Sequence, residues 1–186
     1  MDHPFLAAIA EGLSQRSVAV LRFQFPYVEQ GSRRPDTPAV AQAAVRAAVA
    51  HAAGLWPGLP LFAGGKSFGG RMTSQAQAAE PLSGVRGLAF LGFPLHPAGK
   101  PSITRAAHLA DVDVPMLFLQ GTRDALAELP LVHEAITPLG GRAMLHVVAG
   151  ADHAFHVLVR SGRTDAEVRT ELLDTLAGWM TERAGR

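Results

Sequence analysis

A serine, an aspartate and a histidine lie where they could act together in acyl transfer. Ser67 lies in GKSFG (65–69), Asp124 in GTRD (121–124) and His153 in GADH (150–153). A serine hydroxyl is a weak nucleophile at neutral pH, so a neutral imidazole has to remove its proton during attack. A carboxylate behind the imidazole fixes its tautomer and stabilises the imidazolium that forms. These residue types predict a nucleophile, a base and an orienting acid.

The segment around Ser67 matches G-x-S-x-G, the pattern of a nucleophile elbow. Its glycines allow a sharp turn in which neighbouring backbone passes close to the serine. The helix expected after the turn directs its positive end at a developing oxyanion, and the backbone N–H of Phe68 is the predicted donor. By itself the pentapeptide fits an ordinary strand-to-helix turn equally well. The apolar run before it and the helical run after it favour the elbow.

Both partners of the serine also have simpler interpretations. Asp124 precedes a helical segment and could be a turn former or N-cap, and His153 could be a polar loop residue. The order serine, acid, histidine, each after an apolar run, makes a coincidence improbable. Asp152 is a rival acid, but its adjacency to His153 makes contact with the far ring nitrogen awkward. Two other acids, Asp111 and Asp113, precede a predicted strand and fall at the wrong edge of the sheet.

Strands and helices are expected to alternate along the chain, which predicts an α/β fold. Short apolar runs bounded by Gly or Pro predict strands at 17–25, 60–63, 87–93, 115–120 and 143–148. Helices are predicted from Pro4, with Asp2 as cap, and over 37–53, 71–80, 103–109, 126–139 and 165–183. In the second helix Asp36 is the expected cap and Gly54 the expected end. Such alternation predicts a mainly parallel sheet between two helical layers, with chemistry at the carboxyl ends of the strands.

Composition limits the classes of function. The 186 residues fit a single domain, 1–186, and 48% hydrophobic with 18% charged residues is typical of a folded globular protein. A formal charge of +1, without a basic stripe, argues against a nucleic-acid partner. No run approaches the ~20 apolar residues of a membrane span, and the N-terminus does not resemble a signal peptide. The absence of cysteine excludes disulfides and thiol chemistry and fits a cytoplasmic location, which we expect.

His156 and the proline-rich loop 92–101 are candidates for further functional sites. His156 follows His153 by three residues, but H-x-x-H without a third ligand at helical spacing does not predict a metal, so neither metal nor cofactor is expected. The proline-rich loop 92–101 follows the strand after the elbow. It is either a surface linker or, as we expect, a wall of the acyl pocket formed by Phe93, Leu95 and His96.

Four segments together resemble one known group. GGKSFGGR, LGFPLHPAGKP, PMLFLQGTRD and VVAGADHAF are similar to segments of small, dienelactone-hydrolase-related α/β-hydrolases. More narrowly, they resemble the branch that includes testis-expressed-protein-30-like and NSL-complex-subunit-3-like proteins. The resemblance implies the three-layer α/β-hydrolase sandwich with Ser67, Asp124 and His153 in the triad positions. Dienelactone hydrolases proper use a cysteine nucleophile, so their substrate does not transfer to a chain with serine.

The chain departs from that group at its beginning. In the α/β-hydrolase fold a strand and a glycine-containing loop precede the first helix, and the loop donates a second oxyanion N–H. Here those N-terminal strands are lacking, and the second donor is missing or comes from near Met1. We expect an upstream extension that carries them; otherwise the flanking strands close up or a second subunit fills the gap in a homodimer. The sequence thus predicts a serine hydrolase of a small-molecule ester or related acyl substrate, with a non-catalytic partner-binding module as the alternative.

Overall fold

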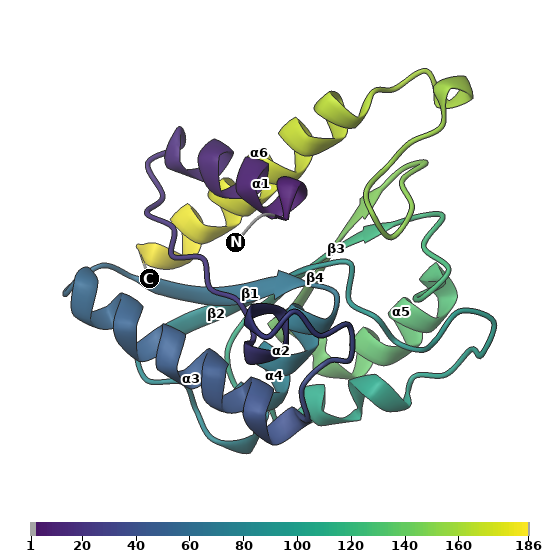
Figure 1. Ribbon diagram of the computed structural model, residues 1–186. Helices are drawn as coiled ribbons and strands as arrows, with labels where there is room; N and C mark the ends of the chain where they lie inside the picture. The colour runs from purple at the N-terminus through teal and green to yellow at the C-terminus, as the bar shows by residue number, and fades with distance from the viewer. Residues whose placement is uncertain (1–2, 186) are drawn as a thin grey trace.

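A four-stranded parallel sheet forms the centre of the molecule (Figure 1). The computed structural model describes residues 3–185. The strands are β1 (Leu61–Lys66), β2 (Val85–Leu91), β3 (Met116–Gly121) and β4 (Ala143–Val148), and their order in the sheet is their order along the chain. The last four predicted strands are therefore confirmed, as is the parallel sheet. Every strand ends at the same edge, which gathers the loops after β1, β3 and β4.

Helices cover both faces of the sheet and make two separate cores. One face carries α3 (Pro38–Leu55), α4 (Phe68–Ala79), α5 (Leu129–Ile136) and the 3₁₀ helices η1 (Thr104–Asp111) and η2 (Thr137–Arg142). The other face carries α1 (Pro4–Ser14) and α6 (Asp165–Ala184), which lie side by side in Figure 1. Along β3, Phe118 packs into the first core while Leu117 and Leu119 pack into the second. Period-2 alternation in a strand that is apolar on both faces explains this division.

The segment predicted as the first strand is not a strand. Residues 18–25 run without strand pairing from the end of α1 to the short helix α2 (Pro26–Glu29). Val18 and Val20 still pack against the α1–α6 core, as strand alternation would have them do. The segment has the side chains of a strand, but it lies across a groove from β1 and is not assigned to the sheet; the Val18 N–H donates instead to the Leu13 carbonyl at 3.0 Å. The sequence pattern shows that a segment could form a strand, but the three-dimensional fold decides whether a neighbouring strand lies close enough to pair with it.

Local predictions differ from the structure in several smaller ways. The N-cap of α3 is Thr37, because the Asp36 carboxylate instead accepts from the backbone N–H of Tyr27 at 3.1 Å. The helix also passes through Gly54 to end at Leu55. The segment predicted as one helix over 126–139 is divided into α5 and η2, and residues 104–111 form a 3₁₀ helix. The cap predicted at Asp2 lies outside the described residues.

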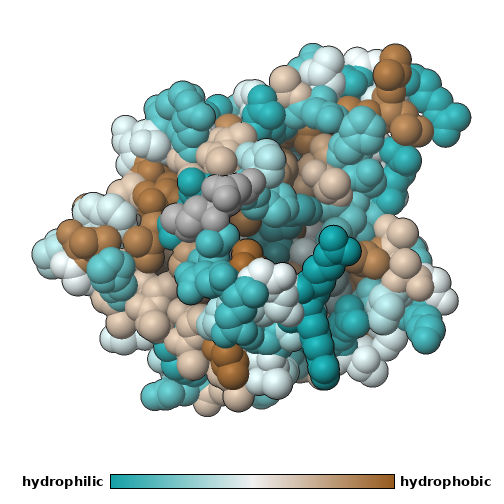
Figure 2. All heavy atoms as spheres, in the orientation of Figure 1, coloured by the Kyte–Doolittle hydropathy of each residue, from teal (hydrophilic) through white to brown (hydrophobic). Residues whose placement is uncertain are grey.

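The last helix is well fixed at its start. Thr164 and Glu167 form a reciprocal capping box, in which the Thr164 hydroxyl accepts from the Glu167 N–H and the Glu167 carboxylate accepts from the Thr164 N–H. Within residues 3–185, no helix has the length and apolar character needed to cross a membrane. In the view of Figure 2, hydrophobic residues occur in several separate groups among hydrophilic ones.

Candidate active site

Ser67 occupies a strained turn between β1 and α4. Its backbone has φ 50° and ψ −118°, a conformation that L-residues rarely adopt. Close backbone contacts surround it: a Cβ added at Gly70 would lie 2.7 Å from the Gly65 carbonyl oxygen and 3.1 Å from the Phe90 ring. Sterics therefore require a glycine at position 70, directly after the motif, whereas a Cβ at Gly69 would meet only the Phe25 ring, at 3.7 Å. Strain of this kind persists only where the surroundings hold it, and it is commonly stored at functional sites.

The three residues predicted from the sequence are joined by hydrogen bonds. The Ser67 Oγ lies 2.9 Å from the His153 Nε2, and the His153 Nδ1 lies 2.7 Å from the Asp124 Oδ2. The serine comes from the end of β1, the aspartate from the loop after β3 and the histidine from the loop after β4. The parallel sheet brings these loops to one edge, which is why residues 86 positions apart in the chain are in contact.

Asp124 is held in a buried position by donors that orient both of its oxygens. Its side chain has no exposed surface. The Gln120 side-chain amide donates to Oδ2 at 2.5 Å, and the Leu126 backbone N–H donates to Oδ1 at 2.8 Å. The Gln120 Oε1 in turn accepts from the Phe93 N–H at 3.1 Å. Gln120 was not identified from the sequence; the available signal was a lone amide side chain in the otherwise apolar strand MLFLQG.

The rival acid has a different role. The Asp152 Oδ1 accepts from the backbone N–H groups of Ala154 at 2.8 Å and His156 at 3.0 Å, so this carboxylate shapes the loop that carries His153. On the other side of the imidazole, Gly92 has φ +70°, and a Cβ there would lie 3.3 Å from the His153 Nδ1. A glycine at this position leaves room for the ring in the orientation that reaches both partners.

Lys66 ties the elbow to the histidine loop. Its Nζ donates to the backbone carbonyl of His153 at 2.5 Å and lies 5.3 Å and 5.5 Å from the ring centroids of Phe5 and Phe155. Burial lowers the pKa of the Lys66 ammonium, and the nearby carboxylates of Asp124 and Asp152 partly oppose that shift. The sequence alone predicts no function for this lysine. Its position directly before the serine was the only signal.

A shallow cleft of about 390 Å³ opens beside the imidazole. It is lined by Lys66, Arg123, Asp152 and His153 together with the apolar side chains of Ala125, Leu126 and Ala154. The cleft gives a substrate access to the histidine from the carboxyl edge of the sheet.

The loop after β2 is buried over residues 92–96 and exposed over residues 97–101. Phe93, Leu95 and His96 are 2%, 2% and 1% exposed. Phe93 packs against the rings of Phe90 and Phe118, and the His96 Nε2 lies 2.5 Å from a Glu128 carboxylate oxygen. These side chains present almost no surface to an acyl group, so the prediction that they form a pocket wall finds no support in the structure. Apolar and proline-rich composition indicated a loop but not which way its side chains face.

The predicted oxyanion donor lies at the beginning of a helix. Phe68 is the first residue of α4, a 12-residue helix whose first turn directs backbone N–H groups and the positive dipole end toward the space beside Ser67. The Phe68 ring contacts those of Phe25 and Tyr27, which places the segment before α3 against the elbow. The second donor expected near Met1 lies outside the described residues.

The remaining histidines have structural partners or are exposed. The His146 Nε2 lies 2.7 Å from Glu171, and the His156 Nδ1 lies 2.9 Å from Asp165. His51 and His133 are exposed on α3 and α5. Among residues 3–185, no group of three or more histidine or carboxylate side chains is close enough to hold a metal ion.

Comparisons with known proteins agree with this architecture. An α/β-serine-hydrolase homologue from Coxiella burnetii is 22% identical and superposes with a TM-score of 0.75, over 95% of this chain and 77% of that one. A serine hydrolase without a lid from Xanthomonas campestris is 23% identical, with a TM-score of 0.72 over 96% and 75% of the two chains. A dienelactone hydrolase from Anabaena variabilis is 18% identical, with a TM-score of 0.71 over 98% and 81%. At these identities the likeness shows the fold.

A match to a family of sequences shows which family the chain belongs to. Residues 1–181 match the family described as an alpha/beta hydrolase domain, which is nearly the whole chain. The narrower resemblance to one branch of these proteins stays a prediction. With its parallel sheet, its elbow between β1 and α4 and a match of this length, the chain belongs to the α/β-hydrolase domain family.

Proposed function

We propose that the protein is a serine hydrolase that cleaves a small ester or related acyl compound through an acyl-enzyme. One observation carries this proposal: a continuous hydrogen-bond chain from Asp124 through His153 to Ser67, with the serine at positive φ. Membership of a family of hydrolases and esterases supports hydrolysis as the class of reaction. The proposal does not specify the acyl group or the leaving group of the substrate. The cleft beside the imidazole is of a size to admit a small substrate.

The geometry supports a two-stage reaction. The Ser67 Oγ attacks the acyl carbonyl carbon while the His153 Nε2 takes the hydroxyl proton, and Asp124 stabilises the imidazolium. The resulting oxyanion is stabilised by the N–H groups at the start of α4. The imidazolium then gives its proton to the leaving alcohol as the ester bond breaks. Water, deprotonated by His153, attacks the acyl-serine and releases the acid and the free serine.

A fluorophosphonate probe tests the nucleophile directly. The protein should be labelled, and Ser67→Ala should abolish labelling. Ser74→Ala is a matched control, because Ser74 is also in contact with a histidine, His108, at 2.8 Å but is fully buried. We expect that control to be labelled like the original protein. Labelling that survives Ser67→Ala would remove Ser67 from the role.

Hydrolysis of p-nitrophenyl acetate and butyrate is the complementary measurement. Turnover that depends on Ser67 supports the enzyme. A folded protein that neither turns over these esters nor reacts with the probe would favour the non-catalytic partner-binding module instead. In that case the triad residues would keep their hydrogen bonds without having a reaction to perform.

A further inference from the structure

The buried part of the loop after β2, residues 92–96, supports both of the groups that orient Asp124. The Gln120 side-chain amide donates to the Asp124 Oδ2, and its own carbonyl oxygen accepts from the Phe93 N–H at 3.1 Å. The Leu126 N–H donates to the Asp124 Oδ1, and the Leu126 carbonyl accepts from the same loop. Each carboxylate oxygen of Asp124 is therefore held by a neighbour that this loop holds in turn.

Two backbone hydrogen bonds join the loop to the turn that follows Asp124. The N–H groups of Leu95 and His96 donate to the Leu126 carbonyl, at 3.0 Å and 3.2 Å. The turn is also closed on itself, because the Ala127 N–H donates to the Asp124 carbonyl at 3.3 Å. The position of the Asp124 carboxylate thus depends on where the loop lies.

The His96 side chain anchors this loop and has no exposed surface. Its Nδ1 lies 2.9 Å from the Pro97 carbonyl oxygen, and its Nε2 lies 2.5 Å from the Glu128 Oε2. Glu128 is the N-cap residue of α5, so this contact joins the loop to the far end of the turn after Asp124. Among the described residues, Glu128 has the only ionisable side chain that is hydrogen-bonded to the His96 ring.

Both ring nitrogens of His96 face oxygen acceptors. A carbonyl oxygen cannot donate, so the contact with Pro97 requires a hydrogen on Nδ1. At Nε2, a pair without a shared proton would bring nitrogen and carboxylate lone pairs together at 2.5 Å. An imidazole is a stronger base than a carboxylate, so a proton between them belongs on the ring. This geometry fits an imidazolium bonded to an ionised Glu128.

We propose that His96 and Glu128 form a charged positioning pair for the acid of the proposed triad. The pair fixes the loop, and the loop fixes the two donors that orient Asp124. A charge-assisted hydrogen bond to a buried ring is strong and costly to leave unmade, which suits it to hold a turn in one place. The effect of the pair on turnover rests on the proposed hydrolase activity, whereas its effect on the contact between Asp124 and His153 does not.

Two substitutions at Glu128 test the positioning pair. Glu128→Ala leaves the buried ring without its partner. We expect kcat for p-nitrophenyl acetate to fall at least about tenfold while KM changes less than about twofold, because the acid is misplaced but the cleft is intact. Glu128→Gln should restore most of the lost kcat, because its amide can donate to the Nε2 of a neutral His96 ring.

NMR of the protein with nitrogen-15-labelled histidine follows the pair without turnover. In the original protein at neutral pH, His96 should carry a hydrogen on both ring nitrogens. The His153 Nδ1 proton, in the 2.7 Å contact with Asp124, should shift in Glu128→Ala. Such a shift in a protein that hydrolyses no ester would contradict the proposed hydrolase and still support the positioning pair.

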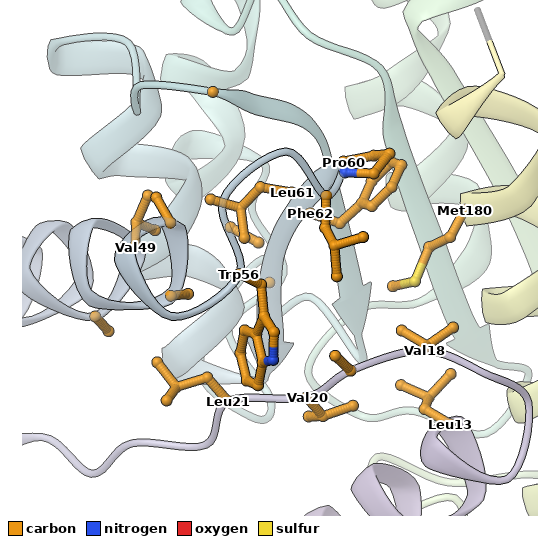
Figure 3. A pocket seen from close by; sticks show the side chains of 18 of the residues that line it. Leu13, Val18, Val20, Leu21, Val49, Trp56, Pro60, Leu61, Phe62 and Met180 are labelled. Carbon is orange, nitrogen blue, oxygen red and sulfur yellow. The ribbon is translucent and has the colours of Figure 1, made fainter.

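Two control variants separate the positioning pair from a general loss of stability. Glu171→Ala removes a carboxylate that contacts a different histidine, His146 of β4, at 2.7 Å. Val49→Ala shortens a side chain in the apolar groove beside β1 (Figure 3), which neither residue of the pair lines. Both controls should lower Tm and keep the kcat and the His153 resonance of the original protein.

Three results would overturn the proposal. The first is a His96 ring with an unprotonated nitrogen at neutral pH, which is measured on the original protein and needs no variant. The second is a Glu128→Ala protein that keeps both the original kcat and the original His153 resonance. The third is an equal loss of kcat in Glu128→Ala and Glu171→Ala, because the loss would then follow from breaking any contact between a histidine and a glutamate.

Discussion

Two residues of the proposed triad, Asp124 and His153, are held in place by neighbours outside the hydrogen-bond chain. Asp124 keeps its orientation because Gln120 and Leu126 donate to it, and His153 keeps its place because Lys66 binds its carbonyl. Such supporting contacts decide whether reacting atoms lie within the fractions of an ångström that catalysis needs. That Ser67, His153 and Asp124 come together could be predicted from residue type, order and position after strands. The supports could not, because amide and ammonium side chains in or beside strands have many structural uses.

Loss of the base gives the first prediction. His153→Ala should lower kcat for p-nitrophenyl esters by several orders of magnitude, on the order of 10⁴-fold, because no group remains to take the serine proton. The measurement is the initial rate with matched protein concentrations. His133→Ala, at an exposed histidine on α5, is the control and should leave the rate unchanged. Equal rates for the original protein and His153→Ala would disprove the triad.

The second prediction concerns a half-buried histidine, His108, outside the proposed triad. Burial and the charge of Arg71 lower the pKa of His108 from 6.5 to about 4, although Asp111 opposes the shift. The unfolded chain therefore binds a proton that the folded chain does not as the pH falls from about 6.5 to about 4. Folding stability should fall over that window and should stop falling, for this group, below it.

Thermal melting between pH 4 and 7 measures this effect. His108→Gln, which can still bond the Ser74 hydroxyl, should flatten the pH dependence by about 1–2 kcal/mol, an amount reduced for partial exposure of the ring. The exposed-site variant His133→Gln should retain the original slope. Parallel profiles for the original protein and His108→Gln would show that His108 is not the titrating group.

Chelation gives the third prediction. Exhaustive dialysis against EDTA should leave the esterase rate unchanged, because in the proposed mechanism Ser67 supplies the nucleophile and His153 removes its proton without the help of a metal-bound water. The readout is the rate before and after dialysis, and again after addition of Zn²⁺. Recovery of a lost rate by Zn²⁺ would contradict this mechanism.

At the scale of elements, two helical glycines differ in how much room surrounds them. Gly70 in α4 contacts the elbow and Phe90, whereas Gly178 in α6 is exposed with nothing within 4 Å of the place where a Cβ would be. The four strands of the sheet were predictable because continuous apolar runs after Gly and Pro indicate strands that helices cover on both faces. The segment 17–25 was predicted wrongly as a strand because the same alternation serves a chain that only borders the core.

The fourth prediction uses this pair of helical glycines. Gly178→Ala should stabilise the protein by about 0.5–1 kcal/mol, which raises Tm by roughly 1–4 °C, since alanine favours the helix and meets no neighbour. Gly70→Ala should destabilise it by about 1–3 kcal/mol, because the added methyl group overlaps the Gly65 carbonyl. Thermal melting of both variants checks the pair. A stabilising Gly70→Ala would mean that the elbow relaxes without strain.

At the scale of the whole molecule, the sheet divides the interior into two cores that are covered by different kinds of segment. The face under α4 is covered by segments that follow one another along the chain, whereas the other face is covered by the first and last helices, α1 and α6. Those two helices are joined by Arg16, whose guanidinium lies 2.7 Å from the Asp174 carboxylate, and by Leu173 against Gly12. The three-layer arrangement was predictable from the alternation of elements. The packing of α1 against α6 was not, because the sequence of neither helix indicates which other helix it packs against.

The sequential strand order also bears on how the chain folds during synthesis. Because β1, β2, β3 and β4 pair in the order in which they leave the ribosome, each new strand finds the edge that the previous one has just formed. Pairing therefore requires only short loop closures, which favours rapid folding. The apolar side of α1, with Ile9 and Leu13, has no such early partner and waits for the last helix to emerge. Until α6 has been synthesised, that apolar surface is exposed on the nascent chain and prone to aggregation.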